Sequence, residues 1–234
     1  MRRRGLMLAC LLVAGAAHAD TVLVRDATIW TQGPDGTLEN ADLLVVDGKV
    51  AKIGTDLRAP RGATVIAAAG KHVTPGLIDC HSHSAIRGGV NEGSNNVTAE
   101  VRNGDVLSPE DIGIYRQLAG GLTTAHLLHG SANSIGGQNA VIKLRWGGTA
   151  DELRFEGAPG GIKFALGENP KRSNFRRPGM PQRYPNTRMG VHESIRERFL
   201  AARDYMRDWE AYEALGDAER KRTAPPRRDL QLDA

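Results

Sequence analysis

VTPGLIDCHSH, residues 73–83, combines a Pro-Gly turn, a short apolar strand and two histidines one residue apart. Side chains alternate between the faces of a strand, so His81 and His83 are expected on the same face, at the strand's end. Two imidazoles in that position can hold one metal ion and leave a coordination position open for water. The alternative is a pair of surface or packing histidines, because this spacing alone is common by chance.

The sequence before this run predicts short strands. Three β-branched stretches bounded by turn residues lie between Thr21 and Val73. Asp47-Gly48 separates LLVV from KVAKIG and predicts a two-residue type I′ hairpin, because both central positions of that turn need positive φ. Residues 20–74 are therefore expected to form a small all-β, sandwich-like unit.

The pattern changes to alternating strands and helices after Pro75. Ser108 and Pro109 predict a helix start as N-cap and first helical residue, and strands are expected at LTTAHLL and at GIKFAL, residues 161–166. A long helix is predicted from about Thr187 by one apolar stripe: Val191, Ile195, Phe199, Ala202, Met206 and Trp209. Strand, helix, strand in this order predicts parallel pairing and an α/β fold for residues 75–234.

The first 19 residues predict a cleaved leader. Three arginines precede an apolar run from Leu6 to Ala17, and Ala17-His18-Ala19 fits a cleavage site. The run is shorter than the roughly 20 residues of a membrane span, so no stable membrane anchor is expected. The sequence thus predicts an exported protein, periplasmic or secreted.

Charge gives no support for nucleic-acid binding, and cysteine usage argues against an intrachain disulfide. Loss of the leader lowers Lys+Arg from 31 to 28 against 27 Asp+Glu, a net charge of +1, which gives no support for nucleic-acid binding. Cys80 is the one cysteine outside the leader, so an intrachain disulfide is not expected.

The run VTPGLIDCHSH, preceded by a β unit containing VVDGKVAKIG, resembles the amidohydrolase superfamily. GIKFALGENPKR and the following TRMG helix resemble its imidazolonepropionase-like branch. The resemblance implies a partial (β/α)8 barrel over residues 75–234, with its site at the C-terminal ends of the strands. It also implies a divalent metal, zinc first, held by His81 and His83, and a metal-bound hydroxide that hydrolyses non-peptide or cyclic C–N amide bonds of a small molecule.

Members of this superfamily usually add a bridging carboxylate to the histidine pair, and two residues here are candidates. Lys163 lies inside the predicted strand, in a position that resembles the carboxylated lysine of the phosphotriesterase-like and prolidase-like branches. Glu168 lies just past the strand's end and needs no modification. The sequence leaves this choice open, and leaves open that Lys163 is an ordinary lysine and Glu168 a cap.

Three polar residues are candidates for substrate contact. Ser131, Asn133 and Gln138 lie in the polar stretch HGSANSIGGQNA, which is expected as a loop at the site mouth, although simple solvation of a loop would explain them equally well. His126, His129 and His192 are not expected to be metal ligands.

The superfamily pattern also calls for two further histidines from the fifth and sixth barrel strands and for an aspartate from the eighth that shuttles protons. None of these is present, because the sequence after Trp209 has no histidine and no further strand pattern. The catalytic acid or base is therefore unassigned, and the sequence is expected to be the N-terminal part of a longer enzyme. Two hypotheses follow: a metal-dependent amidohydrolase, or a catalytically inactive truncated fragment that binds metal weakly. A separate C-terminal half or a homo-oligomer is a possible protein partner.

Overall fold

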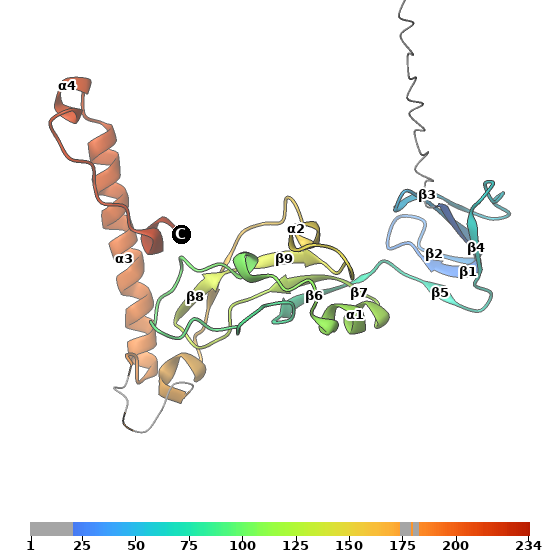
Figure 1. Cartoon of the computed structure of the whole chain (residues 1–234), viewed down its shortest axis with the longest axis horizontal. Coiled ribbons are helices and arrows are strands. Elements are labelled where there is room, and N and C mark those ends of the chain that lie inside the picture. Colours follow the sequence, from blue (N-terminus) through green and yellow to red (C-terminus); the bar gives the residue numbers. More distant parts are fainter. Residues whose placement is uncertain (1–20, 174–178, 180–182) are drawn as a thin grey trace, which may run out of the picture. The chain divides into compact units, whose positions relative to one another are not determined.

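The computed structural model describes residues 21–173, 179 and 183–234, and the leader expected at residues 1–19 lies outside them. The chain divides into two compact units, the first ending at Pro75 and the second beginning at Gly76 (Figure 1). The domain boundaries expected from the sequence remain predictions, and each unit is described separately below.

The N-terminal unit contains one five-stranded sheet. β1 pairs antiparallel with β2 and parallel with both β4 and β5, while β3 pairs antiparallel with β2. The φ angles of Asp47 and Gly48 are 51° and 71°, so the hairpin predicted between β2 and β3 is confirmed. A sandwich-like arrangement remains a prediction. The strands are β1 (Thr21–Trp30), β2 (Thr37–Val46), β3 (Lys49–Gly54), β4 (Thr64–Ala67) and β5 (His72–Val73).

The C-terminal unit mixes strands with helices, as expected for an α/β fold (Figure 1). Within the part of the chain that the structure describes, no helix is both long and apolar enough to cross a membrane. Closure into a (β/α)8 barrel remains a prediction. The strands are β6 (Leu77–Ser82), β7 (Leu122–Leu127), β8 (Ile135–Gln138), β9 (Ala140–Lys143) and β10 (Ile162–Phe164). The helical elements are η1 (Asn103–Val106), α1 (Ile112–Ala119), α2 (Ala150–Leu153), η2 (Asn169–Ser173), α3 (Arg188–Glu213), α4 (Asp217–Arg220) and α5 (Leu230–Asp233).

Two sheets organise this unit. In the first, β6 pairs parallel with β7, as predicted, and β7 pairs antiparallel with β9. In the second, β10 pairs antiparallel with β8. The stretch expected as a polar loop is therefore partly strand. Glycine permits this: a Cβ on Gly136 would lie 2.7 Å from His129 Nδ1, so a side chain there would prevent the close packing of the strand on His129.

The main core lies between the β6-β7-β9 sheet and the helices α1 and α2. Ala125 and Leu127 of β7 pack in one cluster with Ile114 of α1 and Leu153 of α2, and all four are fully buried. Because side chains alternate along β7, His126 belongs to the opposite face of the sheet. Ser82 of β6 is likewise buried and hydrogen-bonds Ser84, which donates to Gln117 of α1. The face with His81 is therefore the one turned away from α1.

The two predicted helix starts differ in outcome. α3 begins at Arg188 with Thr187 as N-cap, whose Oγ1 accepts from the Gly190 N–H at 3.2 Å, so that prediction is confirmed. α1 begins at Ile112, so the start predicted at Ser108 is wrong by three residues. Ser108 opens a turn, in which its carbonyl accepts from the Asp111 N–H, and Asp111 is the N-cap.

Candidate functional site

The two histidines of the sequence motif lie side by side at the end of β6. Their ring centroids are 5.2 Å apart and the rings are nearly perpendicular, at 86°. Both side chains are exposed. The end of β6 thus presents two imidazoles to a common space.

Hydrogen bonding sets the tautomer of His83. Its Nδ1 lies 2.8 Å from the carbonyl oxygen of Leu128, which can only accept, so Nδ1 carries the proton. In the neutral ring, Nε2 is then left with its lone pair. A backbone carbonyl on the second ring nitrogen is the usual arrangement that orients a metal-binding histidine.

Lys163 reaches the same place from β10. Its Nζ lies 3.3 Å from His81 Nε2, although 82 residues separate the two in sequence. The nearby ammonium is the main cause that lowers the pKa of His81, with partial burial and His83 adding to it. Burial lowers the pKa of Lys163 itself, which favours the neutral amine. His81 is therefore held neutral, the form that binds metals.

Glu168, the alternative candidate, lies in a different environment. Its exposed carboxylate forms ion pairs with Arg188, at 2.8 Å, and with Lys171. Hydrogen bonds from these two cations lower its pKa, Lys171 being the larger cause. Lys163 thus contacts His81 of the histidine pair, and Glu168 links the segment after β10 to the start of α3.

The next two histidines along the chain are engaged inside the fold. His129 is 2% exposed; its Nδ1–H donates to the Gly130 carbonyl and its Nε2 accepts from the Glu92 N–H, both at 2.8 Å. His126 Nε2 accepts from the side-chain amide of Asn139. These ring nitrogens are therefore already hydrogen-bonded, and the absence of a ligand role for the two histidines remains a prediction. His192 is exposed on α3.

The three candidate substrate contacts differ in accessibility. Asn133 is fully buried: its amide donates to Glu92 and Thr98, and its oxygen accepts from Arg183. Gln138 lies in β8 and donates to the Ala99 carbonyl at 3.0 Å. Ser131 is half-buried. The geometry gives Asn133 a structural role, whereas substrate contact by Ser131 or Gln138 remains a prediction.

Sequence reasoning missed Arg183. Its guanidinium donates to the backbone carbonyls of Gly93, Asn95 and Ala132 at 2.6–2.8 Å. These bonds join two loops about forty residues apart in sequence, the second of which follows the Leu128 carbonyl that orients His83. No local pattern around position 183 indicates this role, because the contacts are all long-range.

The side chains at this site can be compared with the ligands that the divalent metal implied by the sequence requires. Within the described ranges, no group of three or more His, Cys, Asp and Glu side chains could hold an ion. His81 and His83 supply two neutral nitrogens, and the amine of Lys163 lies beside one of them. These residues supply two ligands of the kind that a divalent ion takes, and Lys163 would add a third only as a carboxylated lysine.

The chain is similar in sequence and in fold to known amidohydrolases. No family model matches the chain. Amidohydrolase tasK from Hapsidospora irregularis is 31% identical over 229 residues, which cover 80% of this chain and 22% of the relative. The crystal structure of an amidohydrolase from Thermotoga maritima superposes with a TM-score of 0.73 and 33% identity, covering 91% of this chain and 54% of that one. These matches support the amidohydrolase superfamily.

Shorter matches within the superfamily favour no single branch. An imidazolonepropionase from Klebsiella pneumoniae is 43% identical over 72 residues, 29% of this chain and 18% of the relative. Several dihydroorotases match over similarly short stretches. The chain spans about half of the solved amidohydrolase and less than a quarter of tasK, so it covers only part of either.

Proposed function

We propose that this chain carries the metal-binding part of an amidohydrolase that cleaves cyclic or other non-peptide amide C–N bonds of small molecules. The observation that supports it best is that Lys163 of β10 reaches the pair His81 and His83 at the end of β6, with Lys163 Nζ 3.3 Å from His81 Nε2. A partial (β/α)8 barrel and zinc as the ion belong to the same proposal.

Each of the three residues has a separate task. His83 offers Nε2 because Leu128 holds the proton on Nδ1. While Lys163 is protonated, its positive charge lowers the pKa of His81 and favours the neutral imidazole. The lowered pKa of Lys163 makes its amine available to add to carbon dioxide: the nitrogen forms a bond to the carbon, loses a proton, and becomes a carbamate with a carboxylate end.

A divalent ion in this position supplies a Lewis acid that polarises an amide carbonyl and acidifies water. The carbamate of Lys163 would place negative charge beside His81, where the protonated lysine places a positive one. Carboxylation would therefore raise the affinity of the site for a cation. We also propose that the chain belongs to the imidazolonepropionase-like branch of the superfamily. From the predicted leader we propose that it is exported to the periplasm or the medium.

The test is metal binding by the purified full chain. Titration with zinc, after chelation and removal of the chelator, is expected to give one bound ion per chain in bicarbonate buffer. The His81→Ala, His83→Ala double variant should bind at least about tenfold more weakly, because loss of even an outer partner costs that much. Lys163→Ala should lose affinity and its dependence on bicarbonate, whereas Glu168→Ala should not.

His72 and His192 provide a matched control, because both are exposed histidines outside the proposed site. Their double alanine variant should bind zinc like the unchanged chain. Equal binding by the His81, His83 double variant and this control would refute the proposal and leave a catalytically inactive fragment as the better account.

A further inference from the structure

Two loops of the C-terminal unit are joined to each other by buried polar contacts. Residues 90–98 follow β6, and residues 129–134 lie between β7 and β8; together they are called the loop pair here. Asn133 donates to the Glu92 carbonyl and to Thr98 Oγ1, both at 2.7 Å. Thr98 is 2% exposed and Asn133 0%. The two loops therefore pack as one polar layer rather than as separate solvated segments.

Arg183 places its guanidinium where four oxygen atoms of the loop pair converge. Nη1 donates to the carbonyls of Gly93 and Asn95, at 2.8 and 2.6 Å, and to Asn133 Oδ1 at 3.1 Å. Nη2 donates to the Ala132 carbonyl at 2.6 Å. Three backbone carbonyls and one side-chain amide oxygen thus surround a single cation, and this arrangement is called the oxygen cage below.

The oxygen cage depends on a positive charge with several donors. Burial lowers the pKa of Arg183, yet a guanidinium keeps its proton in proteins, so the charge is permanent. Its planar fork of N–H groups can reach several oxygens at once, which the point charge of a lysine does less well. Removal of the side chain would leave four converging acceptors without their shared donor, and the cage is then expected to open.

One end of the second loop contacts the histidine side of the proposed metal site. The Leu128 N–H donates to the Ser82 carbonyl of β6 at 3.0 Å, and the Leu128 carbonyl oxygen lies 2.8 Å from His83 Nδ1. Leu128 directly precedes residues 129–134. The position of this loop therefore sets the acceptor that orients the His83 ring.

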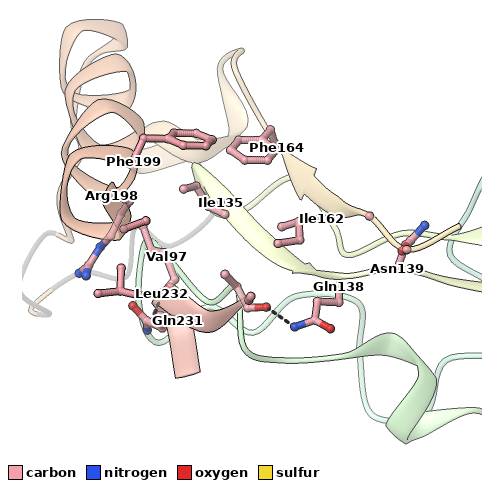
Figure 2. A pocket seen from close by; sticks show the side chains of 15 residues that line it. Val97, Ile135, Gln138, Asn139, Ile162, Phe164, Arg198, Phe199, Gln231 and Leu232 are labelled. Atoms are coloured by element: carbon pink, nitrogen blue, oxygen red, sulfur yellow. Dashed lines mark hydrogen bonds between the residues drawn. The ribbon is translucent and has the colours of Figure 1, made fainter. Parts of the chain in front are cut away.

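The other end of the same loop contacts the strand that carries Lys163. The Ala165 N–H, just after β10, donates to the Ser134 carbonyl at 3.2 Å. Figure 2 shows Ile162 and Phe164 of β10 among the side chains that line a groove beside α3. Strand alternation turns Lys163, which lies between them, to the opposite face, where it meets the histidine pair.

Arg183 holds this loop at Ala132 and Asn133, between its contact with β6 and its contact with β10. We propose that Arg183 is a positioning residue of the amidohydrolase site: by filling the oxygen cage, it keeps Lys163 within reach of the histidine pair. The role of Lys163 rests on the proposed function, whereas the oxygen cage itself does not depend on metal. A guanidinium ion from solution is expected to take the place of the side chain when Arg183 is removed.

The first test is chemical rescue of Arg183→Ala in the full, metal-free chain. The Ala132 N–H donates to Asn91 Oδ1 and the Ala165 N–H to Ser134, so the exchange of these two amides reports on both ends of the loop. Both should exchange at least about tenfold faster in the variant, as measured by NMR. Guanidinium at about 20 mM, far below the molar concentrations that unfold proteins, should restore their protection. Tetramethylammonium, a cation without N–H donors, should not.

Rescue separates a specific role of Arg183 from a general loss of stability. Guanidinium is a denaturant, so a chain that is merely destabilised would exchange faster in its presence. Restored protection therefore requires a site that binds the ion in the folded state.

The second test is whether the oxygen cage positions Lys163. In zinc titrations with bicarbonate, Arg183→Ala should bind at least about tenfold more weakly than the unchanged chain, as expected when an outer partner of a metal site is lost. It should also lose the dependence on bicarbonate, as predicted for Lys163→Ala. The same addition of guanidinium should restore both properties in Arg183→Ala and neither in Lys163→Ala.

Two further variants complete the design. Arg203→Ala removes an arginine of α3 whose side chain is 65% exposed, and it should change neither exchange nor zinc binding. Arg183→Lys keeps the charge without the planar fork, and it replaces Arg183→Ala if that variant does not fold. Its two amides should also exchange at least about tenfold faster than in the unchanged chain. Circular dichroism checks the folding of each variant.

The outcomes separate this proposal from the proposed function. Exchange that is unchanged in Arg183→Ala or Arg183→Lys, or that guanidinium does not restore in Arg183→Ala, overturns the oxygen cage. Zinc binding that keeps its affinity and its bicarbonate dependence in Arg183→Ala overturns the positioning of Lys163 and leaves the proposed function intact. If the unchanged chain binds no zinc, the proposed function fails together with the positioning role, and rescued exchange supports the oxygen cage alone.

Discussion

At the scale of single residues, His129 is a buried histidine whose two ring nitrogens are both in use. Nδ1 donates to Gly130 and Nε2 accepts from the backbone of Glu92. A second proton on Nε2 would replace the acceptor by a donor and break the bond to Glu92. Burial is the main cause that lowers the pKa of His129, so the folded chain favours the neutral ring.

This arrangement predicts a pH-dependent stability. A histidine in the unfolded chain titrates near pH 6.5, whereas His129 in the folded chain titrates lower. Between these two values the unfolded state binds more protons, so the stabilisation is fully present above about pH 6.5 and is lost as the pH falls toward the folded pKa. Urea unfolding of chelator-treated His129→Gln should show a loss of about 1–3 kcal/mol at pH 7.5 and a flatter decline toward pH 5.5.

The exposed His192 is the control for that measurement, and His192→Gln should retain the full decline with pH. Equal slopes for His129→Gln and the unchanged chain would show that His129 does not carry the pH dependence.

Some site residues could be predicted from the sequence and others could not. The pair His81 and His83 is a local pattern, because strand alternation alone puts both side chains on one face. The choice between Lys163 and Glu168 stays a prediction, and the contact of Lys163 with His81 that favours our proposal spans 82 residues, which no local pattern contains. The burial of Asn133 and the bonds from Arg183 are long-range in the same way.

At the scale of elements, the sequence predicted those whose boundary residues act locally. Asp47-Gly48 and Thr187 mark a turn and a helix start by their own backbone or side-chain chemistry. The start of α1 was misplaced because Ser108, Pro109 and Asp111 all suit a helix N-terminus, and a tertiary contact decided among them. That contact joins Asp111 to Ala85.

Asp111 is therefore predicted to stabilise the fold through its two hydrogen bonds. Its Oδ1 accepts from the Gly113 N–H at 2.8 Å and its Oδ2 accepts from the Ala85 N–H at 2.7 Å. Asp111→Ala removes the helix cap and leaves the N–H of buried Ala85 without that acceptor, so the free energy of unfolding should fall by about 1–3 kcal/mol. Urea denaturation followed by circular dichroism measures it.

Asp151 is the comparison residue, because it also lies in the first turn of a helix but its side chain is 93% exposed. Asp151→Ala should change the free energy of unfolding by less than about 0.5 kcal/mol. If the two alanine variants were equally stable, the cap and the bond to Ala85 would not stabilise the fold.

At the scale of the whole molecule, composition and order along the chain predicted the α/β class but not how the sheets close. The open edges that β6 and β10 have within the described residues are properties of the assembled unit, and neither strand's sequence distinguishes an edge from a centre. The predicted leader is the opposite case. Its signal is purely sequential, so it can be tested without reference to the fold.

The leader predicts that the exported chain begins at Asp20. Expression in a bacterial host, followed by fractionation and intact-mass measurement, should give a periplasmic or secreted product that lacks Met1–Ala19. Leu11→Arg with Leu12→Arg interrupts the apolar run that export requires, so this variant should stay in the cytoplasm at full length. Val50→Arg adds a positive charge at an exposed position outside the leader and should be exported normally. An unchanged chain that remains uncleaved in the cytoplasm would contradict export, and with it the single-cysteine composition of the mature protein.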